Sequence, residues 1–268
     1  IWKIDTKGEK KPENFTGHAG RNDSIRLRYV NTDPEKRFIK PNDLLLLSAF
    51  DHITKQSGYY TLAQKGRNPL KKRTMDAFSF SSVTKAKDKE VYAFQKSNFH
   101  TSPDLHVTHN LWQSTEKLTD INPQMRDYNW GTAELFSWSS FTGKPHQGIV
   151  YKPENFDPAK KYPVMIYFYE QHSDNLYSYF APAPSRSTIN IPFFVSRGYV
   201  VFTPDIHYTT GQPGMDAYNS VVAGAEALAE NSWVDKENMA IQGQSWGGYQ
   251  VAYLVTRTDM FKAAGAGA

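Results

Sequence analysis

The sequence contains no cysteine at any of its 268 positions. This absence excludes disulfide bonds, thiolate catalysis and metal sites built on cysteine. It leaves the compartment open between cytoplasm and periplasm, because a large core needs no disulfide in either place. Long apolar runs are missing as well, so no membrane-spanning helix is predicted. What is present, 39% hydrophobic and 22% charged residues, is typical of a soluble globular protein.

The net charge of +4 is unevenly distributed along the chain. Lys and Arg are in excess over residues 1–130, whereas Asp and Glu are in excess over residues 131–268. A basic segment can bind nucleic acid, but here the basic residues are scattered over strand-like segments, and no repeat of aromatic and basic residues accompanies them. No nucleic-acid or membrane partner is predicted. Homo-oligomerisation is left open.

Residues 1–128 are predicted to form part of a β-propeller. Short apolar or alternating runs recur here without helical patterns, and turn residues such as those at 101–104 separate them. Propeller blades take about 40–45 residues, so this length predicts two to three blades, too few to close a ring. The rest of the propeller is therefore expected outside this chain. Strands are predicted at 43–51, 57–64, 76–83, 89–97 and 104–112.

Residues 129–268 are predicted to form the N-terminal part of an α/β-hydrolase domain. Strands and helices alternate here, which favours a mostly parallel sheet with helices on both faces. The boundary between the two parts is placed within 119–131, a segment rich in turn residues. Strands are predicted at 133–141, 145–153, 162–170, 199–205, 239–244 and from 261, and helices at 187–198, 214–231 and 247–257.

The motif that carries chemistry is Gly243-Gln-Ser-Trp-Gly247, a G-x-S-x-G sequence. In this motif a sharp strand-to-helix turn exposes the serine hydroxyl, and the glycines let the chain pass without Cβ clashes. A strand is predicted directly before Ser245 and a helix directly after it, as the motif requires. Ser245 is therefore the predicted nucleophile. The alternative is a serine that only caps the following helix.

A serine nucleophile needs a general base and an oxyanion hole. In this fold class the order along the chain is Ser, acid, His, yet all eight histidines precede Ser245. The backbone N–H of Trp246 is predicted as one oxyanion donor, at the N-terminus of a helix. The second donor is expected after strand 162–170. That loop lacks the glycines of a backbone donor, and a tyrosine hydroxyl could take the role.

These segments resemble the prolyl oligopeptidase family of serine peptidases, within it a bacterial group close to the dipeptidyl peptidases and acylaminoacyl peptidases. Residues 143–170, 198–205 and 243–268 carry the resemblance, which is most specific around the serine. It implies a β-propeller that caps an α/β-hydrolase domain. It also implies Ser245 as nucleophile and Tyr169 as a side-chain oxyanion donor.

Two loops depart from the family pattern. The family's "YGGP" or "YAGP" is replaced by "YEQH" at 169–172, and its "DxRGSG" by "DIHYTTG" at 205–211. Both loops are expected to border the active site, so the substrate-binding residues are left unassigned. Glu170 and His172 could contact substrate, with solvated loop residues as the alternative.

The leading functional hypothesis is a serine peptidase that cleaves short peptides through an acyl-enzyme on Ser245. The alternatives are an esterase or other acyl hydrolase on the same scaffold, and a non-catalytic protein that binds partners through its propeller. No metal and no cofactor are predicted. The Asp and His of the triad are expected beyond residue 268, and this chain by itself is expected to have little or no hydrolytic activity.

Overall fold

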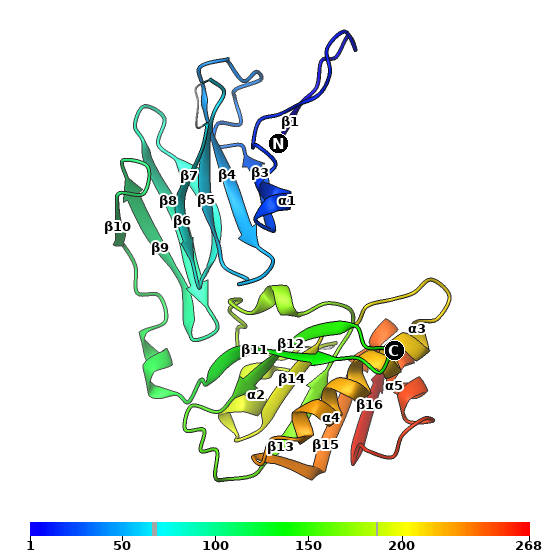
Figure 1. The fold of residues 1–268 in the computed structure, drawn as a ribbon. Helices are drawn as coiled ribbons and strands as arrows, with labels where there is room; N and C mark the ends of the chain where they lie inside the picture. The colour runs from blue at the N-terminus through cyan, green and yellow to red at the C-terminus, as the bar shows by residue number, and fades with distance from the viewer. Residues whose placement is uncertain (66–68, 186) are drawn as a thin grey trace. The chain divides into compact units, whose positions relative to one another are not determined.

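The computed structural model describes residues 1–65, 69–185 and 187–268 (Figure 1). The chain forms two compact units. The first, named here the β unit, comprises residues 1–122 and 177–179, and the second, the α/β unit, comprises residues 123–176 and 180–268. The predicted domain boundary at 128–129 lies close to this division and stays a prediction.

The β unit contains two four-stranded antiparallel sheets, each a meander of consecutive strands. A two-stranded hairpin and one short helix precede them. The hairpin is formed by β1 (Trp2–Lys3) and β2 (Glu13–Asn14), followed by α1 (Ala19–Asn22). The first sheet is formed by β3 (Ile25–Val30), β4 (Leu44–Asp51), β5 (Ser57–Ala63) and β6 (Leu70–Asp76). The second is formed by β7 (Ser79–Lys85), β8 (Val91–Asn98), β9 (Thr101–His109) and β10 (Ser114–Lys117).

The core of the β unit follows from the alternation of side chains along β4. Successive residues of a strand point to opposite faces, so Leu45 and Leu47 pack with Leu62 on one face of the first sheet. Leu46 points the other way and packs with Tyr59 of β5 and Tyr92 of β8. Because Tyr92 belongs to the second sheet, this cluster joins the two sheets to each other.

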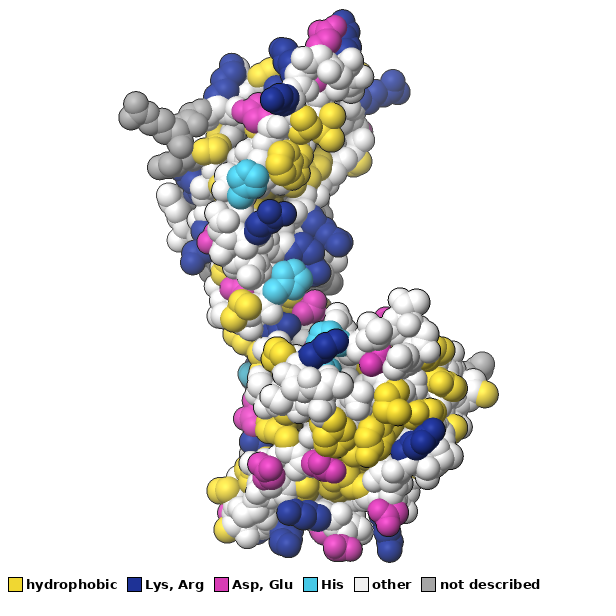
Figure 2. All heavy atoms as spheres, turned by 45° about the vertical axis from the view of Figure 1, so that its right-hand side comes forward, with side chains coloured by type: hydrophobic (Ala, Val, Ile, Leu, Met, Phe, Trp, Pro, Cys, Tyr) yellow, Lys and Arg dark blue, Asp and Glu magenta, His cyan; other side chains and the backbone are white. Residues whose placement is uncertain are grey.

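The hairpin strands β1 and β2 were not predicted from the sequence, and neither were three strands of the two four-stranded sheets: β3, β6 and β10. All three lie at an edge of their sheet. An edge strand has only one neighbour, and charged side chains on it discourage pairing with other chains. The basic residues of β3 and β6 therefore mask the apolar pattern by which strands are recognised. Figure 2 shows many Lys and Arg side chains on the visible face of the β unit.

The turn predicted at 101–104 is wrong, because these residues form the first part of β9. Proline usually interrupts a strand, since it cannot donate a hydrogen bond to the ladder. Here the pairing of β8 with β9 shifts register, so that Lys96 faces Asp104 whereas Asn98 faces Thr101. Pro103 lies in this bulge, where no ladder hydrogen bond from it is needed.

The α/β unit is built on a six-stranded mixed sheet with the order β11-β12-β14-β13-β15-β16. The pairs β11–β12 and β12–β14 are antiparallel, and the other three pairs are parallel. Its strands are β11 (Thr132–Ser139), β12 (Pro145–Lys152), β13 (Tyr162–Tyr167), β14 (Val200–Pro204), β15 (Val234–Gln244) and β16 (Ala263–Gly267). Its helical segments are η1 (Pro123–Asp127), η2 (Ser173–Asn175), α2 (Ile191–Ser196), α3 (Pro213–Ala217), η3 (Tyr218–Val222), α4 (Ala223–Ala229) and α5 (Trp246–Leu254).

Helices pack along this sheet and bury its central strands (Figure 1). Every residue of β14 is buried, as expected for a strand covered on both faces. The predicted helix at 214–231 is present as the continuous run of α3, η3 and α4, whose middle turn is a π-helix. No helix in the described residues is long and apolar enough to cross a membrane.

The helix predicted at 187–198 is shorter than expected. Helix α2 begins after Asn190, whose side-chain oxygen accepts a hydrogen bond from Phe193 N at 3.1 Å. Pro192 follows in the first turn, where a missing N–H costs nothing. The helix ends before Gly198, which has a φ of +84°. The cap at Asn190 explains why the helix does not start at residue 187.

Candidate active site

Ser245 lies at the connection between β15 and α5. Strand β15 ends at Gln244 and helix α5 begins at Trp246, so the strand and helix predicted around the serine are both present. The serine has φ 56° and ψ −115°, a conformation that is costly for a residue with a Cβ. Its side chain is exposed, and its N–H donates to the Gly267 carbonyl at 2.9 Å. This is the geometry of a G-x-S-x-G nucleophile elbow.

The glycines around Ser245 are required by close backbone contacts. A Cβ at Gly243 would overlap the backbone of Gly247 across the turn. A Cβ at Gly247 would lie 2.7 Å from the carbonyl oxygen of Phe168, closer than real Cβ atoms approach backbone oxygen. A Cβ at Gly248 would overlap the carbonyl oxygen of Gly267 in β16. Glycine is therefore needed both for the turn and for packing α5 against its neighbouring strands.

The two predicted oxyanion donors come from two neighbouring segments. Phe168 and Tyr169 directly follow β13, and Phe168 N donates to Gln242 O of β15 at 3.4 Å. A Cβ on Gly247 would lie 3.7 Å from the Tyr169 ring, so this ring lies against the start of α5. Tyr169 and Trp246 are each 39% exposed. The Trp246 N–H is at the first position of α5, where it has no partner within the helix.

The sequence did not reveal that Tyr208 connects these two residues. Its hydroxyl donates to the carbonyl oxygen of Tyr169 at 2.7 Å and accepts from the indole Nε1 of Trp246 at 3.2 Å. The same hydroxyl accepts from Nε2 of Gln250, whose side chain is fully buried. Burial raises the pKa of the Tyr208 hydroxyl, the effect being opposed by the hydrogen bonds from Gln250 and Trp246. Tyr208 thus stays protonated at neutral pH and available as a donor.

No histidine in residues 1–65, 69–185 and 187–268 forms a hydrogen bond with the Ser245 hydroxyl. Two histidines of the α/β unit are instead buried or half-buried elsewhere. His146 has Nδ1 3.0 Å from the Lys144 carbonyl oxygen and Nε2 2.9 Å from Ser220 Oγ. Burial lowers the pKa of His146, and it also lowers the pKa of His172. Neither ring is placed to take a proton from Ser245 by a direct hydrogen bond.

The two loop residues considered for substrate contact, Glu170 and His172, differ in solvent exposure. Glu170 is exposed, as expected of a solvated loop residue. His172 is half-buried, and its ring packs edge-on against that of Tyr167 at 5.6 Å between centroids. The solvated alternative is therefore wrong for His172, because the Nε2 atom of its ring is buried.

Within the described part of the chain, no three residues of the types His, Asp, Glu and Cys are grouped so as to hold a metal ion. His106 of β9 stacks on Phe94 with 5.7 Å between ring centroids.

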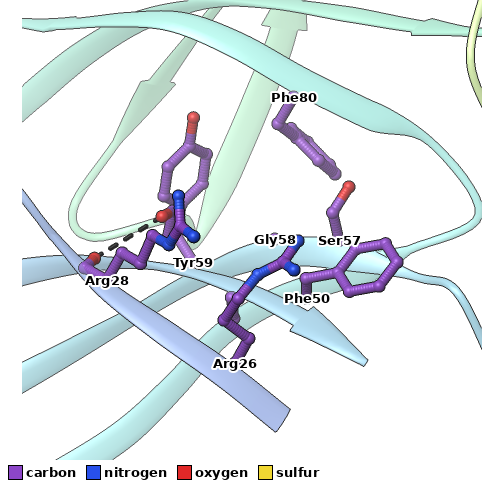
Figure 3. A pocket seen from close by; sticks show the side chains of 9 residues that line it. Arg26, Arg28, Phe50, Ser57, Gly58, Tyr59 and Phe80 are labelled. Atoms are coloured by element: carbon purple, nitrogen blue, oxygen red, sulfur yellow. Dashed lines mark hydrogen bonds between the residues drawn. The ribbon is translucent and has the colours of Figure 1, made fainter. Parts of the chain in front are cut away.

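A separate pocket lies within the β unit (Figure 3). It encloses about 230 Å³, with Arg26 and Arg28 of β3 on one side and aromatic rings from β4, β5 and β7 around it. The Arg26 guanidinium lies 4.8 Å from the centre of the Phe50 ring. This pocket contains hydroxyl groups but no histidine or carboxylate to activate them, so it does not compete with Ser245 as a site of nucleophilic chemistry.

The mixed sheet and the turn at Ser245 are those expected of an α/β-hydrolase site, and comparison with known proteins shows which family the chain resembles. Residues 184–268, which include Ser245, match the model of the prolyl oligopeptidase family. The resemblance to this family that the sequence indicates is therefore confirmed.

Individual relatives agree with this family. Mouse (Mus musculus) dipeptidyl peptidase 8 is 28% identical over 207 residues, which cover 71% of this chain and 22% of the relative. Among solved structures, Porphyromonas gingivalis dipeptidyl peptidase 4 has a TM-score of 0.61 at 20% identity, over 82% of this chain and 33% of that one. Pyrococcus horikoshii acylaminoacyl peptidase has a TM-score of 0.62 at 16% identity, over 82% and 35%.

These neighbours are prolyl oligopeptidase-type proteins, which combine an α/β-hydrolase domain with a propeller. At such identities the structural matches show the fold alone. The chain spans about a fifth of the length of the mouse relative and about a third of each solved structure.

Proposed function

We propose that this chain is part of a serine-type peptidase that hydrolyses short peptides through an acyl-enzyme on Ser245. The observation that carries the proposal is the backbone of Ser245, held at φ 56° between β15 and α5. Strain of this kind costs about 1–3 kcal/mol and persists where the surrounding structure enforces it, most often at functional sites. The family match over residues 184–268 and the relatives named as dipeptidyl peptidases support peptide bonds as the target.

In the proposed reaction, Ser245 Oγ forms a bond to the carbonyl carbon of the peptide while its proton passes to a general base. The carbonyl oxygen becomes an oxyanion, which accepts hydrogen bonds from the Trp246 N–H and the Tyr169 hydroxyl. Collapse of this intermediate breaks the C–N bond, and the base gives its proton to the nitrogen, so that the neutral amine leaves. Water then releases the acid from Ser245 by the reverse sequence of steps. The described residues supply the nucleophile and the oxyanion donors, and we assign no residue to the base.

The β unit fits the proposal as part of a propeller. Its two four-stranded sheets have the strand order of propeller blades, and propellers accompany the hydrolase domain in the structural neighbours. A relative of this chain is named as a dipeptidyl peptidase, which supports short peptides as the substrate class. We therefore expect cleavage of peptides of a few residues and none of a folded protein.

A substrate comparison on the full-length protein tests this function. Aminoacyl-arylamides and short-chain esters are assayed side by side with the wild type, Ser245→Ala and the control Ser139→Ala. Ser139 is exposed on β11 and is expected to tolerate the change. We expect arylamide hydrolysis that is lost in Ser245→Ala and kept in Ser139→Ala. Efficient ester turnover without amide cleavage would instead favour an acyl hydrolase that acts on esters.

A further inference from the structure

The two loops that depart from the family pattern are bound to each other. The first, residues 169–173, follows β13, and the second, residues 205–211, follows β14. These strands are parallel neighbours in the sheet, so their carboxyl ends lie at the same edge. Ligands of open α/β sheets bind at this edge. The contacts between the loops therefore bear directly on the geometry of the candidate active site.

The first set of contacts fixes the main chain of the first loop. The Asp205 carboxylate is 5% exposed and accepts from His172 N at 2.6 Å, Ser173 N at 2.8 Å and Ser173 Oγ at 2.5 Å. Ile206 N also donates to the Glu170 carbonyl at 2.7 Å. Charge-assisted hydrogen bonds to a buried carboxylate are strong, so the second loop sets the position of the first.

The second set of contacts passes through the Tyr208 hydroxyl. A phenol has one proton to donate and oxygen lone pairs to accept with. Its proton goes to the Tyr169 carbonyl, and it accepts from the side chains of Trp246 and Gln250. One hydroxyl therefore joins Tyr169, in the loop after β13, to Trp246 and Gln250 of α5. The joined residues Tyr169 and Trp246 are the two proposed oxyanion donors.

The innermost contact of this connection, between Tyr208 and Gln250, is buried. Gln250 is fully buried beneath Tyr208, and its Oε1 has no hydrogen-bond partner among the described residues. Releasing Tyr208 would leave the amide of Gln250 without its one described partner inside the protein, which is unfavourable. The Trp246 indole is held by the same hydroxyl, and it stacks on the Tyr249 ring at 5.2 Å between centroids.

We propose that Tyr208 is a positioning residue for the oxyanion hole: its hydroxyl holds Tyr169 and Trp246 in the arrangement that receives the oxyanion. This inference rests on the proposed function of Ser245. It assigns no contact between Tyr208 and substrate. On this proposal, the second loop, "DIHYTTG", differs from the family pattern because it carries Tyr208. The tyrosine compensates for the first loop, which lacks the family's glycines.

Removing only the hydroxyl tests the inference. Tyr208→Phe, Tyr169→Phe and the double variant are compared in the full-length protein with Tyr199→Phe as control, since Tyr199 packs on Phe194 by its ring and lies outside both loops. Loss of one oxyanion donor lowers kcat about 100-fold or more, which we expect for Tyr169→Phe. We expect Tyr208→Phe to lower kcat about tenfold with little change in KM, because misplacement weakens transition-state binding.

The double variant separates positioning from a general structural role. If Tyr208 acts through Tyr169, the Tyr208→Phe substitution lowers kcat much less in the Tyr169→Phe background than in the wild type. Hydrogen exchange over residues 169–173 gives a readout that needs no turnover, and it is expected to accelerate in Tyr208→Phe and not in Tyr199→Phe. Unchanged kcat, independent effects in the double variant, or unchanged exchange would overturn the inference. Full activity in Ser245→Ala would instead overturn the proposed function and leave the exchange result to decide the role of Tyr208.

Discussion

Gly248 offers the sharpest test of how the nucleophile turn is built. In a helix, Gly→Ala gains at most about 1 kcal/mol from helix propensity. A Cβ here, however, would overlap the Gly267 carbonyl oxygen and lie 3.0 Å from its carbon. Both atoms belong to the backbone of β16, so no side chain can rotate away. Overpacking of this kind costs about 3 kcal/mol.

The same overlap also affects a hydrogen bond of the nucleophile, Ser245. The Gly267 carbonyl accepts the hydrogen bond from Ser245 N at 2.9 Å, and weakening that bond costs about 1 kcal/mol more. The net expectation for Gly248→Ala is therefore destabilisation of the α/β unit by about 3 kcal/mol, together with slower acylation of Ser245.

Urea denaturation followed by circular dichroism measures the first effect, and kcat/KM for an arylamide measures the second. Ala252→Gly is the matched control, because Ala252 is exposed in the same helix and its replacement loses only helix propensity, about 1 kcal/mol. An unchanged or raised unfolding midpoint in Gly248→Ala would refute the packing argument, since propensity alone would then decide the outcome.

Three further predictions follow from other parts of the molecule. First, stability should fall as the pH drops below about 6.5, the model-compound pKa of histidine. Burial lowers the folded-state pKa of His146 and His172, so the unfolded state binds more protons just below 6.5. Urea midpoints at pH 7.5 and 5 check this, and the difference between the two midpoints should be smaller in His146→Gln. Second, Asp104→Asn should destabilise the β unit by about 2 kcal/mol. The carboxylate is 3% exposed, and it accepts from Lys117 Nζ, Thr119 Oγ1 and Ile121 N. A thermal midpoint equal to that of the wild type would contradict it. Third, the 268-residue chain by itself should react slowly with a fluorophosphonate, because no described histidine bonds the Ser245 hydroxyl. Stoichiometric labelling at the rate of an ordinary serine hydrolase would refute this.

Features set by local chain geometry could be predicted from the sequence. The turn at Ser245 needs glycine at fixed offsets because the backbone of Gly243 meets that of Gly247, and such offsets are visible in the sequence. Likewise, β14 is recognisable because burial on both faces favours apolar residues, here the run Val200–Phe202. The strand before the serine and the helix after it follow from the same local pattern.

Features set by contacts between distant segments could not be predicted. Tyr208 lies 39 residues from Tyr169 and 38 from Trp246 along the chain, so no local pattern marks their hydrogen bonds. The edge strands β3, β6 and β10 were missed because an edge tolerates charge where a central strand does not. Pro103 suggested a turn because the bulge that accommodates it is a property of the β8–β9 pairing and not of β9 alone.

The most direct test of Ser245 as the nucleophile is to map the site of covalent labelling. The full-length protein is treated with a fluorophosphonate, digested and analysed by mass spectrometry, with residual arylamide hydrolysis measured in parallel. We predict a single adduct on Ser245, formed in proportion to the loss of activity and absent from Ser245→Ala. An adduct on another serine that accompanies the loss of activity, or undiminished hydrolysis by Ser245→Ala, would contradict it.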